Sequence, residues 1–189
     1  MAWRLRRSPL LWSLAAPAAA LSAPAPAFAA DYLSADQAQA SIFPEADRFE
    51  ARELALEADE RRALEKRLAL PVRERWSARL ARRGEERLGV VVVDDVIGKF
   101  ERITFAVGGG ADGAVRQIEI LSYRESHGHE VRLPFWRKQF VGRGPTSALR
   151  VGEDIANISG ATLSCRHVTD GVRRIVAVVE ALRRRGALE

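Results

Sequence analysis

The sequence predicts an α+β fold: an antiparallel sheet with helices packed on one face and a long C-terminal helix. Two observations predict it. Four β-rich segments between residues 75 and 123 are joined by short turns that contain glycine, and short turns imply antiparallel pairing because parallel strands need long crossovers. Residues 168–182 instead repeat apolar side chains at helical spacing. Helices packed on one face and at the ends of such a sheet define the α+β class.

The segment before these strands predicts two helices and a strand. Residues 34–48 open with Ser34, a suitable N-cap, and predict a short helix that Pro44 ends. Residues 51–57 alternate in polarity as a strand does. Residues 57–70 carry leucines and charges at helical spacing, so a second helix is expected there.

The second half of the chain predicts the sheet and its closing helices. We expect the glycine-rich stretch 108–113 to be a turn. Aromatic residues in 132–142 group on one side of a short amphipathic helix. Arginines in the last turn of the final helix suit the negative end of its dipole, and Gly186 stops it. The four strands are expected at residues 75–83, 87–98, 99–108 and 113–123.

Residues 1–30 have the three parts of a secretory signal peptide: a basic start, an apolar core that Pro17 interrupts, and an Ala27-Phe28-Ala29 cleavage site. The apolar run is shorter than the roughly 20 residues that cross a bilayer. We expect cleavage near Ala29 or Ala30 and a periplasmic product, with an uncleaved anchor as the alternative. Arg6-Arg7 resembles a twin-arginine signal, but ordinary export is the default.

The mature chain is expected to form one domain, with residues 31–84 as an N-terminal helical and strand segment and residues 85–189 as the core. Loss of residues 1–30 removes three arginines and no acids, so the formal net charge falls from +5 to +2. No basic run is interleaved with aromatic residues, which argues against a nucleic-acid partner. The only cysteine is Cys165, so no internal disulfide forms.

A cluster of small residues, Ser159-Gly160-Ala161-Thr162, stands directly before the final helix. Ser164 is a reasonable N-cap, so Thr162 is expected on the approach to the helix N-terminus. Free backbone N–H groups and the positive end of the helix dipole favour a phosphate there. The residues therefore suit a phosphate-bearing group on or near Thr162, although such clusters are also ordinary turns and caps.

Residues 159–164, SGATLS, resemble the S-G-A-T-x-[ST] signature of the FMN-binding domain family, which includes flavin-carrying subunits of the sodium-pumping and Rnf-type membrane oxidoreductases. The resemblance extends from about residue 85 to 182 through "GKFERITFAVGGGADGAVRQIEILSYRESHGHEV", "QFVGR" and "HVTDGVRRI". The start of the mature chain, "DYLSADQAQASIFPEADRF", is similar to that of small exported soluble members.

The resemblance implies a phosphoester between Thr162 and FMN, transferred from FAD by a separate Mg-dependent flavin transferase. It implies a membrane-bound redox partner. It also implies that the loop after the last strand, with Tyr123, Glu125 and His127, lies beside the flavin ring. The expected cofactor-binding residues are Thr162, Ser159, Gly160, Ala161, Ser164, Glu125, Tyr123, His127 and Gly128.

One position departs from the family signature. An Asp usually stands three residues before the Ser, and here that residue is Ala156, with Asp154 as the nearest acid. Either Asp154 serves the same purpose from a shifted position, or the domain binds flavin without covalent modification. We favour modification.

Other residues carry weaker hypotheses. His127 and His129 lack a recognisable third ligand, so a polar loop is favoured over a metal site. Cys165 and His167 lie on different sides of a helix and would not share a proton, so a hydrolase that uses Cys165 or Thr162 lacks a base. Lys99 suits either a phosphate or a solvated turn.

The sequence therefore predicts an exported electron carrier with FMN on Thr162. No G-x-G-x-x-G opens a helix as a nicotinamide site requires. The alternative from another class is a non-redox binding or assembly module with the same fold and no covalent flavin.

Overall fold

The computed structural model describes residues 30–188, which form one six-stranded sheet. The strands lie in the order β1-β6-β5-β4-β3-β2, and each neighbouring pair is antiparallel. Their bounds are β1 (Ala30–Asp31), β2 (Arg48–Ala55), β3 (Arg75–Arg83), β4 (Glu86–Ile97), β5 (Arg102–Gly110) and β6 (Val115–Tyr123). The expected cleavage site at Ala27-Phe28-Ala29 and the residues before it lie outside the described residues.

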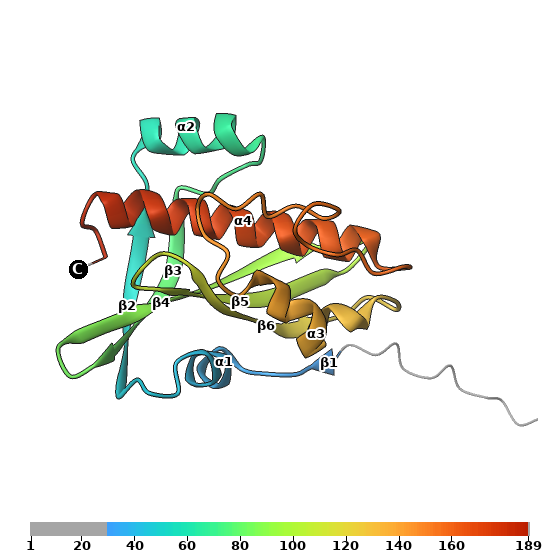
Figure 1. Ribbon diagram of the computed structural model, residues 1–189, viewed down its shortest axis with the longest axis horizontal. Helices are drawn as coiled ribbons and strands as arrows, with labels where there is room; N and C mark the ends of the chain where they lie inside the picture. Colours follow the sequence, from blue (N-terminus) through green and yellow to red (C-terminus); the bar gives the residue numbers. More distant parts are fainter. Residues whose placement is uncertain (1–29, 189) are drawn as a thin grey trace, which may run out of the picture.

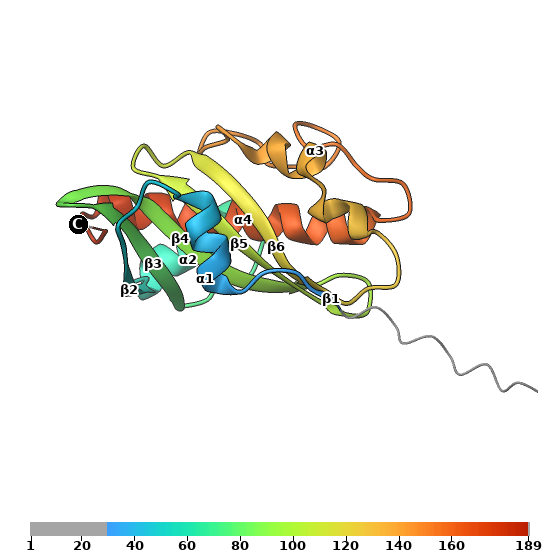
Figure 2. The same cartoon turned by 90° about the horizontal axis from the view of Figure 1, so that it is seen from below.

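The helices confirm the α+β class. The long C-terminal helix α4 (Thr162–Arg184) packs on β4 and β5, and α2 (Ala58–Leu68) lies over α4 on the same side (Figure 1). The prediction packed the helices on one face and at the ends of the sheet. The short helix α1 (Ala35–Ile42) instead covers the opposite face (Figure 2). Beside β6 lie η1 (His129–Arg132), α3 (Pro134–Arg137) and η2 (Lys138–Phe140), which correspond to the expected aromatic helix.

Helix α4 lies close to the sheet because it has a glycine at the point of contact. A Cβ on Gly171 would come within 2.5 Å of the Phe105 ring. Buried Asp94 of β4 also ties the sheet to α4 through an ion pair of 2.9 Å with Arg174, and Arg73 approaches the same carboxylate at 2.8 Å. The last turn of α4 is basic, and Gly186 follows with a φ of +72°, as the helix-end signals predict.

Ser34 is the N-cap of helix α1, as expected, and its hydroxyl accepts a hydrogen bond from the Gln37 backbone N–H. It packs directly on two strand glycines. A Cβ on Gly108 would come within 2.2 Å of Ile42, and one on Gly89 within 2.5 Å of the Phe43 ring. The expectation of a turn beginning at residue 108 is therefore wrong: β5 runs to Gly110, because these glycines are strand positions that admit α1.

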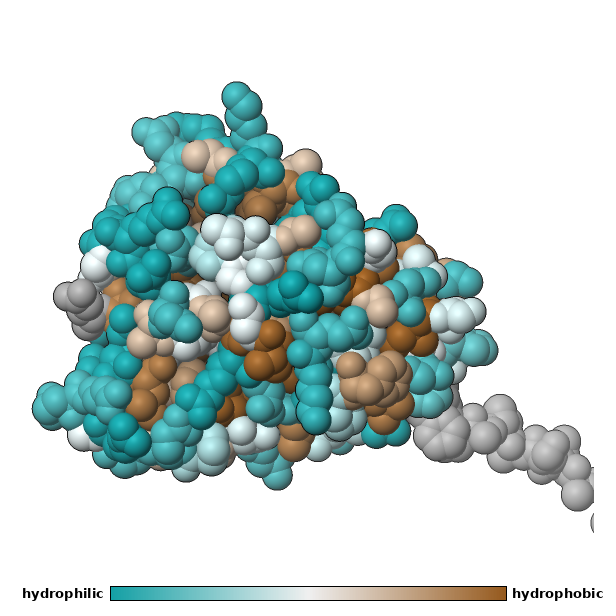
Figure 3. Space-filling view, in the orientation of Figure 1, coloured by the Kyte–Doolittle hydropathy of each residue, from teal (hydrophilic) through white to brown (hydrophobic). Residues whose placement is uncertain are grey.

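The surface of the described part is mostly charged or polar, with small apolar patches between the charges (Figure 3). Within residues 30–188, no helix has the length and apolar character of a membrane span. The two apolar clusters lie on opposite faces of the sheet, a large one under α4 and a smaller one under α1.

Candidate functional site

The small-residue segment forms a tight turn at the N-terminal end of α4, on the right in Figure 1. The Ala161 N–H donates to the Ile158 carbonyl at 3.0 Å, and Gly160 has a φ of +83°, which favours glycine. The helix begins at Thr162 with Ala161 at its N-cap position. The expectation that Ser164 caps the helix is therefore wrong, since Ser164 already lies in the first turn.

The side chain of Thr162 is exposed at the first residue of α4. Asn157 holds its hydroxyl, because Asn157 Nδ2 donates to Thr162 Oγ1 at 3.1 Å. The first N–H groups of a helix have no partner within the helix and carry the positive end of its dipole. Thr162 thus presents an oriented hydroxyl at a place that stabilises negative charge.

Ser164 supports this first turn from inside the protein. Its side chain is 4% exposed and lies 3.0 Å from the hydroxyl of Tyr123, which is 1% exposed. Tyr123 donates to the carbonyl of His127, so Ser164 donates to Tyr123. Burial raises the pKa of Tyr123 to about 12, although the Ser164 hydrogen bond opposes this shift. The tyrosine is therefore a neutral structural link between β6, the loop after it and α4.

The loop after β6 also touches the small-residue segment directly. A Cβ on Gly128 would come within 2.6 Å of the Ala161 Cβ and 2.7 Å of the Tyr123 hydroxyl. Gly128 has a φ of +84°, so both its backbone and its contacts require glycine. Two predicted segments far apart in sequence are thus in contact.

Glu125 binds the β4–β5 turn. Its Oε1 accepts hydrogen bonds from the N–H groups of Phe100 at 2.6 Å and Glu101 at 2.9 Å. Burial alone would raise the pKa of Glu125, but hydrogen bonds from the backbone of residues 99–101 and the charge of Lys99 outweigh it and lower the pKa. The carboxylate is therefore charged and occupied with the turn.

These segments surround a hollow of about 440 Å³. Six of the nine predicted residues line it, whereas Ser159, Tyr123 and Gly128 do not and lie in the segments around it. The lining residues are Lys99, Phe100, Glu125, Ser126, His127, Gly160, Ala161, Thr162, Leu163 and Ser164.

At Ala156, where the family signature usually has an acid, the nearest acid is Asp154, and its carboxylate already has partners. Both oxygens of Asp154 accept backbone hydrogen bonds, from Leu149 at 3.0 Å and Arg150 at 2.8 Å. Burial would raise the pKa of Asp154, but these bonds and the charge of Arg143 lower it. The acid nearest the signature is thus engaged in holding its own loop, where Leu149 has a left-handed φ of +46°.

The weaker sequence hypotheses gain no support from the geometry. Cys165 is fully buried, and burial raises the pKa of its thiol, so it is a poor nucleophile. In the region that the structure describes, no group of three or more potential metal ligands forms around the histidines or elsewhere.

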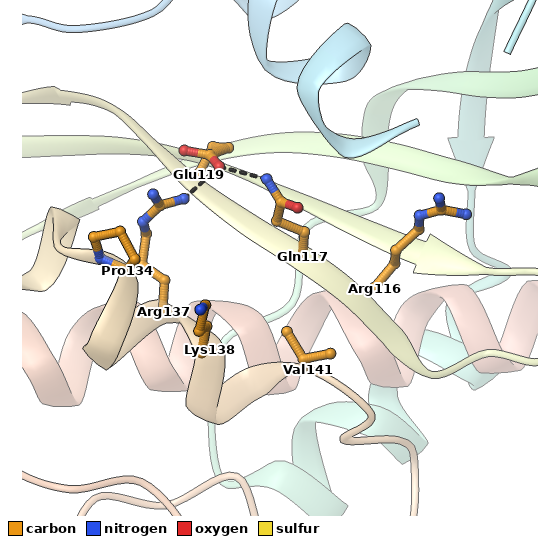
Figure 4. Close-up of a pocket in the computed structure, with 7 residues that line it drawn as sticks. All are labelled: Arg116, Gln117, Glu119, Pro134, Arg137, Lys138 and Val141. Atoms are coloured by element: carbon orange, nitrogen blue, oxygen red, sulfur yellow. Dashed lines mark hydrogen bonds and ion pairs between the residues drawn. The ribbon is translucent and has the colours of Figure 1, made fainter. Parts of the chain in front are cut away.

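A larger hollow of about 710 Å³ lies between β6 and the α3–η2 segment (Figure 4). Its carboxylate, Glu119, is paired with Arg137 and accepts a hydrogen bond from Gln117 at 2.6 Å. Arg137 also donates to the backbone carbonyl of Ile118 in β6 at 2.8 Å. None of the predicted site residues lines this hollow, and three of its polar side chains, Gln117, Glu119 and Arg137, are occupied with one another.

Sequence reasoning missed several residues of the site. Phe100, Ser126 and Leu163 line the smaller hollow and were not predicted, and neither was Asn157, the partner of the Thr162 hydroxyl. His167 was considered only as a partner for Cys165, and its Nδ1 instead lies 2.6 Å from the Ile97 carbonyl and 3.1 Å from the Gly98 carbonyl. An aromatic residue in a tight glycine turn was the available signal for Phe100, because such turns usually carry polar residues.

Residues 98–177 match the model of the FMN-binding domain family. The matched region contains the β4–β5 turn, β5, β6, the site loops and most of α4. The match supports an FMN-binding domain and FMN as its cofactor. No curated protein matches the chain.

Proposed function

We propose, on the premise that residues 98–177 form an FMN-binding domain, that the protein is an exported electron carrier with FMN esterified to Thr162. The observation that carries the proposal is the exposed Thr162 hydroxyl at the start of α4, inside the matched region and in the wall of the hollow.

The residues fit a phosphate ester at this position. The first turn of α4 offers backbone N–H groups and the positive end of a 23-residue helix. A Cβ built on Gly160 meets nothing within 4 Å, so the approach to Thr162 is open. Lys99 lines the same hollow and supplies a positive charge.

Attachment requires a transferase and FAD, as the family resemblance implies. Thr162 Oγ1 forms a bond to the flavin-side phosphorus of FAD, the bond between the two phosphates breaks, and AMP leaves. The hydroxyl proton passes to a base of the transferase. Asn157 donates to Oγ1 rather than accepting from it, so it orients the hydroxyl without removing this proton.

The bound flavin supplies the redox chemistry by accepting and releasing electrons. The protein holds it in place and sets the charge around it. A covalent tether keeps the cofactor at high effective concentration outside the cytoplasm, where free FMN is scarce. Export through residues 1–30 to the periplasm and exchange of electrons with a membrane-bound partner belong to this proposal.

One observation favours a second function. Ala156 stands where the signature usually has an acid, and Asp154 is occupied by the backbone of its own loop. A domain that the transferase does not recognise would be a non-redox binding or assembly module with the same fold.

The intact mass of the mature protein, produced with an active flavin transferase, tests the proposal. We expect the wild type to gain the mass of FMN less one water and the Thr162→Ala variant to gain nothing. Thr146→Ala is the control, because Thr146 is also exposed but lies outside the hollow; it should be modified like the wild type.

An unmodified wild type would reject covalent attachment and favour the module. Modification that persists in Thr162→Ala would place the ester on another residue.

A further inference from the structure

The β4–β5 turn presents an exposed aromatic ring beside Thr162. Phe100 is 74% exposed, the largest value among the exposed large hydrophobic side chains of residues 30–188. Leu163, which follows Thr162, is 39% exposed, and both residues line the hollow. Single exposed apolar residues are ordinary, but Phe100 and Leu163 line the same hollow as Thr162 and give it an exposed apolar wall.

This turn is fastened from two sides. Glu125 accepts from its backbone N–H groups, and His167 of α4 donates to its carbonyls. The Gly98 N–H donates to the Glu101 carbonyl at 2.8 Å, and a Cβ on Gly98 would lie 2.5 Å from Glu125 Oε1. The exposed ring therefore stands on a backbone that is held in one conformation by the elements that carry the rest of the site.

A cation accompanies the ring. Lys99 Nζ lies 4.8 Å from the centroid of Phe100, and Lys99 also lines the hollow. A flat aromatic face with an adjacent positive charge suits a planar heteroaromatic ligand that gains negative charge when it is reduced.

We propose that Phe100 and Lys99 form the platform for the isoalloxazine ring of FMN held on Thr162. Phe100 covers one face of the ring from solvent, and Lys99 favours its reduced form electrostatically. This inference rests on the proposed function, because the ester on Thr162 determines which hollow the ring can reach.

The test compares Phe100→Ala with Phe135→Ala, a control that removes a ring 62% exposed on α3, outside the hollow. Intact mass first gives the flavin content of each variant. Quenching of flavin fluorescence by acrylamide then reports solvent access to the ring. We expect Phe100→Ala to keep its flavin but to be quenched severalfold more strongly than the wild type and Phe135→Ala.

Lys99→Gln tests the charge, with Lys138→Gln as its control, since Lys138 is exposed on η2, outside this hollow. We expect Lys99→Gln to shift the midpoint potential of the flavin to more negative values, and Lys138→Gln to leave it unchanged. Full flavin content with unchanged quenching in Phe100→Ala and an unchanged potential in Lys99→Gln would overturn the platform.

Failure of the covalent attachment is distinguishable from failure of the platform. If the wild type gains no mass, free FMN is titrated into wild type and Phe100→Ala. Weaker binding by Phe100→Ala, with Phe135→Ala unchanged, supports the platform without the ester. Equal binding by all three proteins, or no binding by the wild type, overturns it.

Discussion

At the scale of single residues, the segment Ser159-Gly160-Ala161-Thr162-Leu163-Ser164 divides into two sets. Four residues, Ser159, Gly160, Thr162 and Leu163, are exposed, whereas Ala161 and Ser164 are buried. The buried pair contacts Gly128 and Tyr123. The small residues thus do two things: the exposed ones leave Thr162 accessible, and the buried ones let a neighbouring loop pack against the helix start.

Tyr123 makes the stability of this junction depend on alkaline pH. Its pKa rises from 10.0 to about 12 in the folded protein, so the folded state holds the phenolic proton more tightly than the unfolded state. The contribution of the Tyr123 proton to the free energy of unfolding is complete below pH 10 and is lost as the pH rises from 10 to 12. The loss is about 2–3 kcal/mol. At pH 11, halfway through this range, about half of the loss, roughly 1–1.5 kcal/mol, should have occurred relative to pH 8, and urea unfolding at the two pH values measures it.

Tyr123→Phe removes the titrating group and should flatten this part of the pH dependence. The variant should already be less stable at pH 8 by about 1–3 kcal/mol, because the His127 carbonyl and the Ser164 hydroxyl lose their partner. Tyr32→Phe, at the other tyrosine of the chain, is the control and should keep the wild-type dependence. An equal alkaline loss in Tyr123→Phe would assign it to other groups.

At the scale of elements, the site is a junction of one turn, one loop and one helix end. The loop after β6 touches the small-residue segment through Gly128, and the β4–β5 turn touches both the loop and α4. Glu125 and His167 are therefore best understood as residues that position other parts of the site.

Gly128→Ala tests whether the loop must lie this close to α4. The new Cβ would overlap Ala161 and the Tyr123 hydroxyl, in addition to the cost of a left-handed backbone. Gly152→Ala is the matched control, because Gly152 has a φ of +90° and open space around a built Cβ. We expect Gly152→Ala to cost about 1 kcal/mol and Gly128→Ala about 1–3 kcal/mol more, measured by urea unfolding. Equal costs would mean that the contact relaxes freely.

The helices and strands could be predicted where the local sequence pattern determines their secondary structure. Residues 75–83 form β3 as expected, and the segments expected at 87–98 and 113–123 differ from β4 and β6 by no more than two residues at an end. Gly108 of β5 was assigned to a turn because its place in the strand depends on contact with α1, which ends 66 residues earlier in the chain. A local pattern carries no information about that contact.

The candidate site divides in the same way. Thr162 and its neighbours are contiguous, so a short motif identifies them. Phe100 and His167 enter the site through contacts across the fold, and no spacing along the chain marks them. Asn157 lies only five residues before Thr162 but outside the motif. Ser164 was misassigned as a cap for a related reason: its partner is a tyrosine 41 residues away.

At the scale of the whole molecule, one sheet separates two apolar clusters. The larger lies under α4 and the smaller under α1. Both depend on β5, because Phe105 faces α4 at Gly171 and Gly108 faces α1 at Ile42. A disturbance on the α1 face should therefore destabilise the α4 face, including the start of α4 that carries Thr162.

Gly108→Ala tests this coupling. A methyl group there would lie 2.2 Å from Ile42, and overpacking of this kind costs about 1–3 kcal/mol. Gly109→Ala is the control, since its Cβ would make ordinary contacts of 3.8 and 3.9 Å; it should be neutral or slightly stabilising because alanine reduces the freedom of the unfolded chain.

The readout combines circular dichroism with chemical labelling of Cys165, the fully buried thiol on the α4 face. Most small domains unfold in one cooperative step. If the two faces belong to one such unit, both signals should move to lower urea together in Gly108→Ala. The two faces unfold independently if the circular dichroism signal shows two transitions. They also do so if Cys165 stays protected from labelling while the dichroism transition moves to lower urea. Loosening of α1 would then leave the Thr162 site intact, and the site could be studied in variants that lack a well-packed α1.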